Sequence, residues 1–294
     1  MKIKMSLGEK IFEIFNMLFM LLLMTITIYP LLYVAFASVS QPDEMIKHTG
    51  LLLHPLGFTV GAYKMVFENP MILQSYFNTI VYVITGTAVN IVMTTLAAFV
   101  LSRRGFMLKN ALMMLIVFTM FFNGGLIPSY LVVRSLGIYN TMLALILPTS
   151  ISTYNLIIMR TYFNSLPYSM EESAKIDGAN ALVILLKIIL PLSMPIIAVM
   201  LLFYGVGHWN SWFSAMIYLR NRELYPLQLI LREILISSST DNMLTNLSPT
   251  TDKEPVSEIV KYATIMVATI PILFVYPFLQ KYFVKGVMIG AIKG

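Results

Sequence analysis

The chain has 294 residues, of which 58% are hydrophobic and only 12% are charged. This composition is far more apolar than that of a soluble globular domain, so we expect a lipid bilayer to surround most of the chain. Cysteine is absent, which excludes disulfides, thiolate metal sites and a cysteine nucleophile. The formal charge of +6 comes from lysines and arginines in short loops between apolar runs, a pattern that reports membrane orientation rather than nucleic-acid binding.

Six apolar runs follow one another along the chain, and a helix that crosses the hydrocarbon layer requires about 20 such residues. The runs cover residues 11–37, 76–101, 111–127, 141–159, 188–212 and 259–283. The first is roughly twice as long as the apolar part of a signal peptide, so we expect a retained span although residues 35–37 resemble a cleavage site. The sequence predicts an all-α integral membrane protein with six transmembrane helices in a single domain over residues 1–294.

Basic residues occupy alternate loops, and this alternation predicts the orientation of the spans. With the amino terminus inside, the cytoplasmic cations are Arg103, Arg104, Lys109, Arg160, Lys175, Lys187, Lys281, Lys285 and Lys293. The acidic or mixed segments, residues 42–70 and 220–258, then lie on the opposite side. We therefore expect both termini in the cytoplasm and an extracytoplasmic loop over residues 213–258.

Two segments carry residues that disfavour regular helix. Asn123, Gly124, Gly125 and Pro128 interrupt the third run, and a broken helix inside a membrane is tolerated only against protein or a watery cavity. The run of serines and threonine at residues 237–240 is typical of an exposed loop.

Between the fourth and fifth runs, residues 160–187 form a cytoplasmic loop that is longer than a simple connection requires. Pro167 precedes a short predicted helix, in which Ser169 is expected to cap the amide of Glu172 and the Glu172 side chain to return the bond. Gly178 is predicted to end this helix in the left-handed conformation. A second helix is expected over residues 180–190, with Pro191 and Pro195 marking the start of the fifth span.

The same loop resembles the signature of importer permeases: Glu-Ala-Ala, three residues, Gly, nine residues, Ile, one residue, Leu-Pro. Glu172-Ser173-Ala174 and Gly178 match its first part, and Ile188, Leu190 and Pro191 match its second part at the required spacings. The departure is Ser173, where the family usually has alanine. Without the resemblance, Glu172 would be read as a capping residue and Gly178 as a helix stop, and both roles can coexist with the family role.

The resemblance implies a type I ABC importer fold in the bacterial plasma membrane, with a coupling helix that docks on an ATPase subunit between spans 4 and 5. The ATPase-coupling residues that it implies are Glu171, Glu172, Ser173, Ala174, Asp177, Gly178, Ala179, Leu190 and Pro191. The chain has no phosphate-binding loop of the Gly-x4-Gly-Lys-Ser/Thr type, so we expect no catalytic residue and no cofactor on this chain. ATP and Mg²⁺ would bind two partner ATPase subunits, and the other implied partners are a second permease and an extracellular binding protein.

Further segments resemble the carbohydrate-importing branch of the family. They are residues 123–128, 208–212, 225–232 and 286–294. This resemblance implies a saccharide cargo, and an amino acid, peptide or ion remains the alternative within the same class of transporter. Arg134, Arg220 and Arg232 on the predicted outer side would suit an acidic oligosaccharide, although pairing with nearby glutamates is the more ordinary role for arginines.

Polar and aromatic residues within the spans are candidates for the substrate path, because aromatic faces and amides bind sugars. Tyr204, His208 and Trp212 follow i, i+4 and i+8 spacing and are expected to share one helical face. The full candidate set is Asn78, Asn123, Asn155, Tyr204, His208, Trp209, Asn210 and Trp212. The alternatives are that aromatic residues anchor span ends and that asparagines bond neighbouring helices. No second ligand lies at metal-binding spacing from His208, so we expect no metal site.

Two other classes fit the sequence less well. An ion-coupled secondary transporter normally places ionisable residues at mid-membrane and often has repeated halves, and this sequence shows neither. A membrane-embedded enzyme would require a catalytic constellation in the span centres, which is also missing from the sequence.

Overall fold

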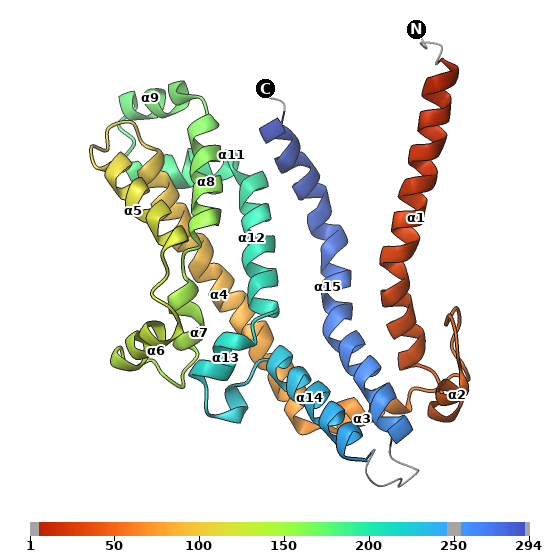
Figure 1. Cartoon of the computed structure of the whole chain (residues 1–294). Coiled ribbons are helices and arrows are strands. Elements are labelled where there is room, and N and C mark those ends of the chain that lie inside the picture. The colour runs from red at the N-terminus through yellow and green to blue at the C-terminus, as the bar shows by residue number, and fades with distance from the viewer. Residues whose placement is uncertain (1–5, 246–253, 292–294) are drawn as a thin grey trace. The chain divides into compact units, whose positions relative to one another are not determined.

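A computed structural model describes residues 6–245 and 254–291, and in these ranges the chain forms helices and no strand. The first half contains α1 (Leu7–Ser38), α2 (Pro42–Lys47), α3 (Gly61–Glu68), α4 (Pro70–Ser102), α5 (Lys109–Phe121), α6 (Leu126–Ser135), α7 (Leu143–Ile146) and η1 (Leu147–Thr149). The second half contains α8 (Thr153–Ser165), α9 (Tyr168–Ile176), α10 (Ala181–Ile184), η2 (Leu185–Ile189), α11 (Leu190–Leu192), α12 (Met194–Trp209), α13 (Phe213–Tyr218), η3 (Arg222–Leu224), α14 (Leu227–Thr245) and α15 (Glu254–Ala291). Figure 1 shows their order along the chain.

Three stretches of the described helices are long and apolar enough to cross a membrane singly: Leu7–Ser38, Pro70–Ser102 and Ile259–Pro277. Three bent helix pairs reach the same length together, which gives up to six spans if each pair crosses once. The pairs are Lys109–Phe121 with Leu126–Ser135, Leu143–Thr149 with Thr153–Ser165, and Ala181–Leu192 with Met194–Trp209. The six predicted runs therefore fall on three single helices and three broken ones.

The chain divides into two compact units. Unit 1 comprises Met1–Asn69 and Glu233–Thr269. In it, Tyr29 Oη accepts a hydrogen bond from the Leu52 amide at 3.0 Å, and the ring of Tyr33 meets the edge of Tyr262 at 5.9 Å. The most apolar window of α1 has no buried residue, which fits a helix that presents its side chains to lipid.

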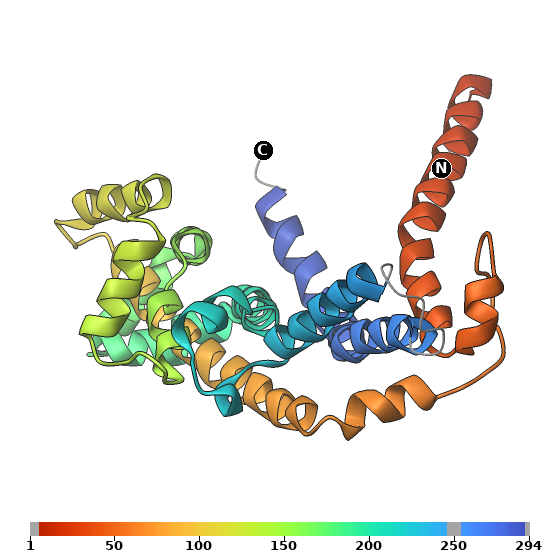
Figure 2. The same cartoon turned by 60° about the horizontal axis from the view of Figure 1, so that its bottom comes forward.

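Unit 2 comprises Pro70–Arg232 and Ile270–Gly294, and α4 is its central helix. Helices α8 and α12 pack along α4, and their buried apolar side chains form one core around Phe163, Met159 and Met200. Figure 2 shows α4, coloured orange, from a second direction. The arrangement of α4 determines where polar groups can lie inside this unit.

Polarity along α4 is the reverse of that in a soluble helix. Its buried positions include polar residues, whereas many of its exposed positions are large and apolar. The buried polar residues are Ser75, Asn78, Thr79, Thr87, Asn90, Thr94, Thr95 and Ser102. The exposed apolar residues are Leu73, Phe77, Ile80, Ile84, Val92, Met93, Leu96 and Val100. A helix in lipid turns its polar groups toward the bundle interior, so this pattern supports the predicted membrane environment.

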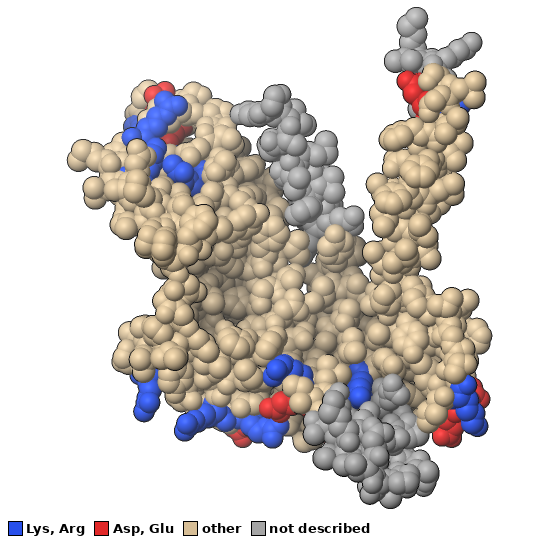
Figure 3. Space-filling view, in the orientation of Figure 1, with Lys and Arg blue, Asp and Glu red and all other residues tan. Residues whose placement is uncertain are grey.

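Charged side chains of unit 2 gather at two ends of the unit. In Figure 3 they cover the region of α9 and the start of α5, and again the region beside α6 and α13, with an uncharged band between the two. A band without charges is the surface that a hydrocarbon layer requires.

The predicted break in the third run is confirmed. The chain bends by 117° between α5 and α6, where Gly125 has φ +91 and precedes the first residue of α6. A positive φ of this size favours glycine, because a side chain would clash with the backbone.

A second bend, of 83°, separates α11 from α12 and was not predicted. Pro195 lies in the first turn of α12, directly after this bend. In an unbroken helix its ring would clash with the carbonyl four residues earlier, and it would have no N–H to donate to that carbonyl. The bend at Ser193 removes that conflict, so what was predicted as the start of a straight span is a sharp turn.

The exposed loop predicted at residues 237–240 is wrong. These residues continue α14, which runs from Leu227 to Thr245. No proline or glycine occurs between Pro226 and Pro249, and the apolar residues before position 237 recur at helical spacing, so the backbone has no reason to stop there. The predicted loop over 213–258 therefore contains α13, η3 and α14, and its residues 246–253 lie outside the described residues.

Candidate functional site

The helix that carries the signature is α9, and its start differs from the prediction. Pro167 is the N-cap, with φ −60 and no side-chain capping bond. Ser169 therefore lies inside the first turn and cannot cap Glu172, so the predicted capping box is wrong. The reason is local: proline fixes φ at a value that suits a helix start, and the helix begins directly after it.

The end of α9 confirms the predicted role of Gly178, which has φ +79. The Ala179 amide donates to the Ala174 carbonyl at 2.9 Å, and the Gly178 amide donates to the Lys175 carbonyl at 3.1 Å. This pair of bonds is the Schellman arrangement, which satisfies carbonyls at the end of a helix. The chain then turns into α10, where the Asn180 side chain caps the amide of Val183 at 2.9 Å.

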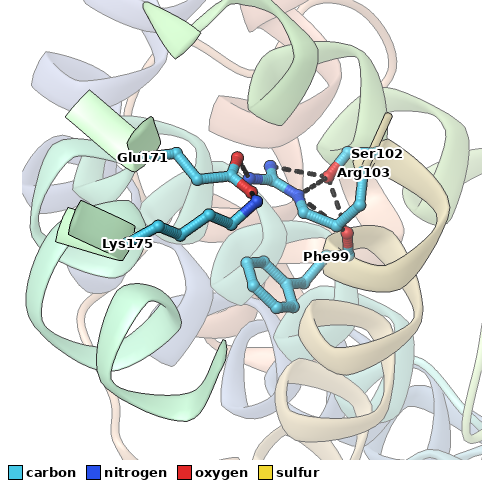
Figure 4. A network of polar contacts seen from close by, with 5 residues as sticks. All are labelled: Phe99, Ser102, Arg103, Glu171 and Lys175. Carbon is cyan, nitrogen blue, oxygen red and sulfur yellow. Dashed lines mark hydrogen bonds and ion pairs between the residues drawn. The ribbon is translucent and has the colours of Figure 1, made fainter. Parts of the chain in front are cut away.

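Glu171 fastens α9 to the end of α4 (Figure 4). Its side chain is almost fully buried and forms ion pairs with Arg103 and, at 2.8 Å, with Lys175. Arg103 also donates to Ser102 Oγ at 2.9 Å and to the Phe99 carbonyl at 3.3 Å, and its guanidinium lies 4.6 Å from the centre of the Phe99 ring. The hydrogen bond to Glu171 raises the pKa of the Lys175 ammonium, which stays charged near neutral pH.

The candidate coupling residues divide into an inner and an outer set. Glu171 and Ala174 are buried against the bundle, and Ala179 and Leu190 are half-buried on its core. The exposed set is Glu172, Ser173, Asp177, Gly178 and Pro191. Ile176, which the sequence did not single out, is 85% exposed on the same helix.

The sequence pattern predicts Arg103 only as an orientation signal, and its ion pair with the buried Glu171 is a contact that this prediction lacks. A usable pattern was present, because Glu171 and Lys175 stand at i and i+4 and a second cation near the end of the preceding span could reach the same carboxylate.

Among the candidates for the substrate path, Tyr204 joins three helical segments. Its hydroxyl shares a 2.7 Å hydrogen bond with Thr94 Oγ1 of α4 and accepts the Ser152 amide at 3.1 Å. The side chain is buried. These contacts hold α12 against α4 and the start of α8, so the hydroxyl has a structural role.

His208 lies one turn further along α12 and contacts Asn90, which is fully buried. Asn90 Nδ2 donates to the Thr149 carbonyl at 2.6 Å, so its Oδ1 is left to accept from His208 Nε2, also at 2.6 Å. A Cβ on Gly86 would lie 2.5 Å from His208 Nε2, so the glycine makes room for the ring. Asn90 thus connects α4, η1 and α12.

Asn78 and Asn155 are also buried. Asn78 Nδ2 donates to the carbonyls of Glu223 at 2.6 Å and Tyr225 at 3.0 Å, which ties α4 to the segment around η3. The backbone amide of Asn155 donates to Ser152 Oγ at 3.5 Å, at the start of α8. Asn78 thus bonds a neighbouring segment, which was the alternative that the sequence left open for asparagines.

The shared face predicted for Tyr204, His208 and Trp212 is wrong for Trp212. Helix α12 ends at Trp209 with Asn210 as its C-cap, and Trp212 instead precedes the first residue of α13. Asparagine and serine at 210 and 211 compete for backbone hydrogen bonds and favour a helix end. Trp212 lies under the guanidinium of Arg232, whose Cζ is 4.2 Å from the ring centre.

The three remaining candidates line different places. Trp209 meets the edge of Tyr76 at 6.2 Å and borders an apolar cavity of about 430 Å³ in unit 2. Asn123 borders a cavity of about 260 Å³ that Phe213 also lines, and its Oδ1 accepts the Gly125 amide at 3.0 Å. Asn210 is exposed. Among the side chains that the structure describes, those of residues 6–236 and 259–277, no three His, Asp or Glu gather as metal ligands would.

Comparison with known proteins places this geometry in a family. Over 286 residues the chain is 43% identical to the polygalacturonan/rhamnogalacturonan transport system permease protein YtcP of Bacillus subtilis, covering 96% of this chain and 99% of that one. Protein LplC of Bacillus subtilis is also 43% identical, over 97% of this chain and 96% of that protein.

A solved structure is similar as well. It is a crystal structure of a bacterial ABC transporter involved in the import of the acidic polysaccharide alginate, with a TM-score of 0.85, 30% identity, and coverage of 96% of this chain and 100% of that one. Residues 90–289 match the family of binding-protein-dependent transport system inner membrane components. The chain belongs to this family of ABC importer permease subunits.

Proposed function

We propose that this chain, with a second permease, forms the translocation path of an ATP-driven importer for an acidic saccharide. The observation that carries the proposal is α9, a surface helix fixed at its inner side by Glu171 and Arg103 and open to a partner at Glu172, Ser173 and Ile176. Two ATPase subunits would supply ATP hydrolysis with Mg²⁺, and an extracellular binding protein would deliver the cargo.

The Glu171 contact explains how a push on α9 would reach the transport path. The ion pair ties α9 to the last turn of α4, the helix against which α8 and α12 pack. When the ATPase pair closes, displacement of α9 would therefore move the end of the central helix. Such movement between rigid packed elements is the basis of alternating access, in which the cavity opens first to one side and then to the other.

The topology that we propose has six spans, with each bent pair crossing once and both termini and α9 in the cytoplasm. The cysteine-free sequence permits a direct test. Cysteines replacing Ser173 and Asn221, both exposed, should react from opposite sides of the membrane. In intact cells an impermeant maleimide should label the cysteine at position 221 alone. Labelling of the cysteine at position 173 alone would show that the topology is the inverse of the proposed one.

The proposed cargo carries carboxylates, as the names of the relatives suggest. Arg134, Arg220 and Arg232 form no ion pair with a carboxylate among the side chains of residues 6–236 and 259–277. Instead, Arg220 lies 5.9 Å from the Tyr139 ring centre and Arg232 lies over Trp212. A cation beside an aromatic face can bind both the carboxylate and the C–H surface of a uronate.

Transport by the reconstituted complex tests this function. Proteoliposomes are prepared with both permeases and the ATPase subunits, and the binding protein is added outside. They should accumulate labelled oligogalacturonate only when ATP is enclosed in the vesicle lumen, which the ATPase subunits face. Unlabelled oligogalacturonate should compete, and a neutral oligosaccharide of equal length should not. Uptake driven by an ion gradient without ATP would instead identify a secondary transporter, and transport of peptides or amino acids alone would exclude a saccharide cargo.

A further inference from the structure

A small polar cavity lies where α4, α5, α8 and α9 meet. Its volume is about 220 Å³, and Arg103, Arg104, Lys109, Tyr168 and Glu171 are among its lining residues. The cavity borders the ion pair in Figure 4 but is not filled by it.

Two cations that line this cavity have no ion-pair partner among the described side chains. Arg103 and Lys175 both bind Glu171, so the carboxylate is neutralised within the protein. Arg104 and Lys109 form no ion pair with a carboxylate among the described side chains, those of residues 6–236 and 259–277. The Arg104 guanidinium is held in place by the Tyr168 ring, 4.2 Å from its centre. Two cations that line one cavity favour an anion there, and a phosphate oxygen pair is a good acceptor for a guanidinium.

The turn between these cations points to a lipid as the source of the anion. Met107 is 96% exposed and Leu108 is 61% exposed, directly between Arg104 and Lys109. Beyond the cations, α4 and α5 continue with exposed apolar side chains such as Val100 and Leu112. An apolar tip flanked by cations is the arrangement of a segment in the headgroup layer, where the tip enters the acyl region and the cations meet phosphates.

We propose that this cavity binds the phosphate headgroup of an anionic phospholipid in the leaflet nearest α9. Arg104 and Lys109 hold the phosphate, and Met107 and Leu108 lie against the acyl chains. The proposal rests on the cytoplasmic orientation of α9 in the proposed function. Since the lipid would lie beside Arg103 and Glu171, the lipid composition of the membrane would influence how firmly α9 is held.

Native mass spectrometry of the complete transporter tests the site. The complex is placed in nanodiscs of phosphatidylcholine with phosphatidylglycerol, and the phosphatidylglycerol retained after release is counted. Replacing Arg104 and Lys109 together with Gln should lower affinity for the bound phosphatidylglycerol, by about fivefold for each cation removed. Arg104→Lys keeps the charge and should retain the lipid, and Lys187→Gln removes an exposed cation outside the cavity and should change nothing. Equal retention by the double variant and the wild type would overturn the proposal.

Two further measurements distinguish a lipid from a soluble anion and from a contact with the ATPase subunits. Inorganic phosphate should not displace the lipid, and displacement by phosphate at equal strength would make this a site for a soluble anion. If the double variant loses the ATPase subunits while its lipid count is unchanged, the cations belong to a protein contact and the lipid site is overturned. Saccharide-stimulated ATP hydrolysis of the wild type is measured separately, so a failed transport assay with lipid retained would count against the proposed function and not against this site.

The apolar tip provides an independent check in the folded complex. A polarity-sensitive fluorophore on Met107→Cys should be quenched by nitroxides on lipid acyl chains, and the same label on Ser173→Cys should not be. Absence of quenching at position 107 would show that the turn lies outside the membrane and would overturn the proposal.

Discussion

The two regions of unit 2 that carry its polar contacts are held together by different chemistry. At α9 the joint is charged, with Glu171 between Arg103 and Lys175. Along the length of α4, the joints are neutral hydroxyls and amides, such as Tyr204 with Thr94 and Asn78 with backbone carbonyls. Charges are costly in hydrocarbon but are tolerated near the membrane surface, whereas hydroxyls and amides can be satisfied inside it. The position in the bilayer thus decides which kind of contact can hold two helices together.

The charged joint should be the more sensitive of the two. Glu171→Ala leaves Arg103 beside the protein interior without its partner, and breaking such a buried pair costs about 3 kcal/mol. We expect a clear fall in the thermal stability of the assembled complex and loss of saccharide-stimulated ATP hydrolysis. Glu172→Ala, at an exposed position, should change stability by less than about 0.5 kcal/mol. Equal stability of the two variants would show that the ion pair does not fasten α9.

The end of α9 should show a smaller effect that arises from the backbone alone. A Cβ on Gly178 would meet no atom within 4 Å, so a substitution there acts through its φ of +79. Gly178→Val should destabilise by about 2 kcal/mol, and Gly178→Asn by much less, because asparagine adopts this conformation more readily. Coupling of ATP hydrolysis to uptake should fall in the same order. If Asn and Val were equally harmful, the side chain and not the backbone would be responsible.

The neutral joint at Tyr204 should cost less to break. Tyr204→Phe leaves the Ser152 amide and the Thr94 hydroxyl without this partner, which corresponds to about 1 kcal/mol. Differential scanning fluorimetry of the complex should show a modest decrease in melting temperature with unchanged uptake per assembled complex. A lower uptake per complex with unchanged stability would return Tyr204 to the substrate path.

The smallest effect is expected at the outer arginine. Arg232→Gln should raise the half-saturating concentration of an acidic oligosaccharide roughly twofold to fivefold, the size expected for one accessible charge contact. Uptake of a neutral saccharide, if transported, should not change. Arg232→Lys keeps the charge, so its half-saturating concentration for the acidic oligosaccharide should lie between those of the wild type and Arg232→Gln. An identical change for charged and neutral cargo would indicate that Arg232 only supports the Trp212 ring.

Local chemistry allowed some features to be predicted from the sequence. The stop at Gly178 and the break at residues 123–125 each follow from residues whose backbone preferences act within a few positions. The spacing of the signature also predicted the family to which the chain belongs, and the comparisons confirm this family.

Other features depend on contacts that the sequence does not display. Which of two adjacent glutamates faces the bundle depends on how α9 packs against the end of α4, and the structure buries Glu171 and leaves Glu172 exposed. Trp212 was predicted on the wrong element because the i, i+4, i+8 spacing extends past Trp209, where α12 ends in the structure. The partners of Asn78, Asn90 and Tyr204 are distant in sequence, and only the packed helices bring them together.

The reversed polarity of α4 also has a consequence for synthesis. Asn90 enters the bilayer with its helix, but the Thr149 carbonyl that accepts its amide lies 59 residues later and His208 lies 118 residues later. At common translation speeds these partners follow after roughly 3 to 12 and 6 to 24 seconds. During that time an unpaired amide in lipid is unfavourable, so we expect α4 to stay beside the insertion machinery until α12 has been made.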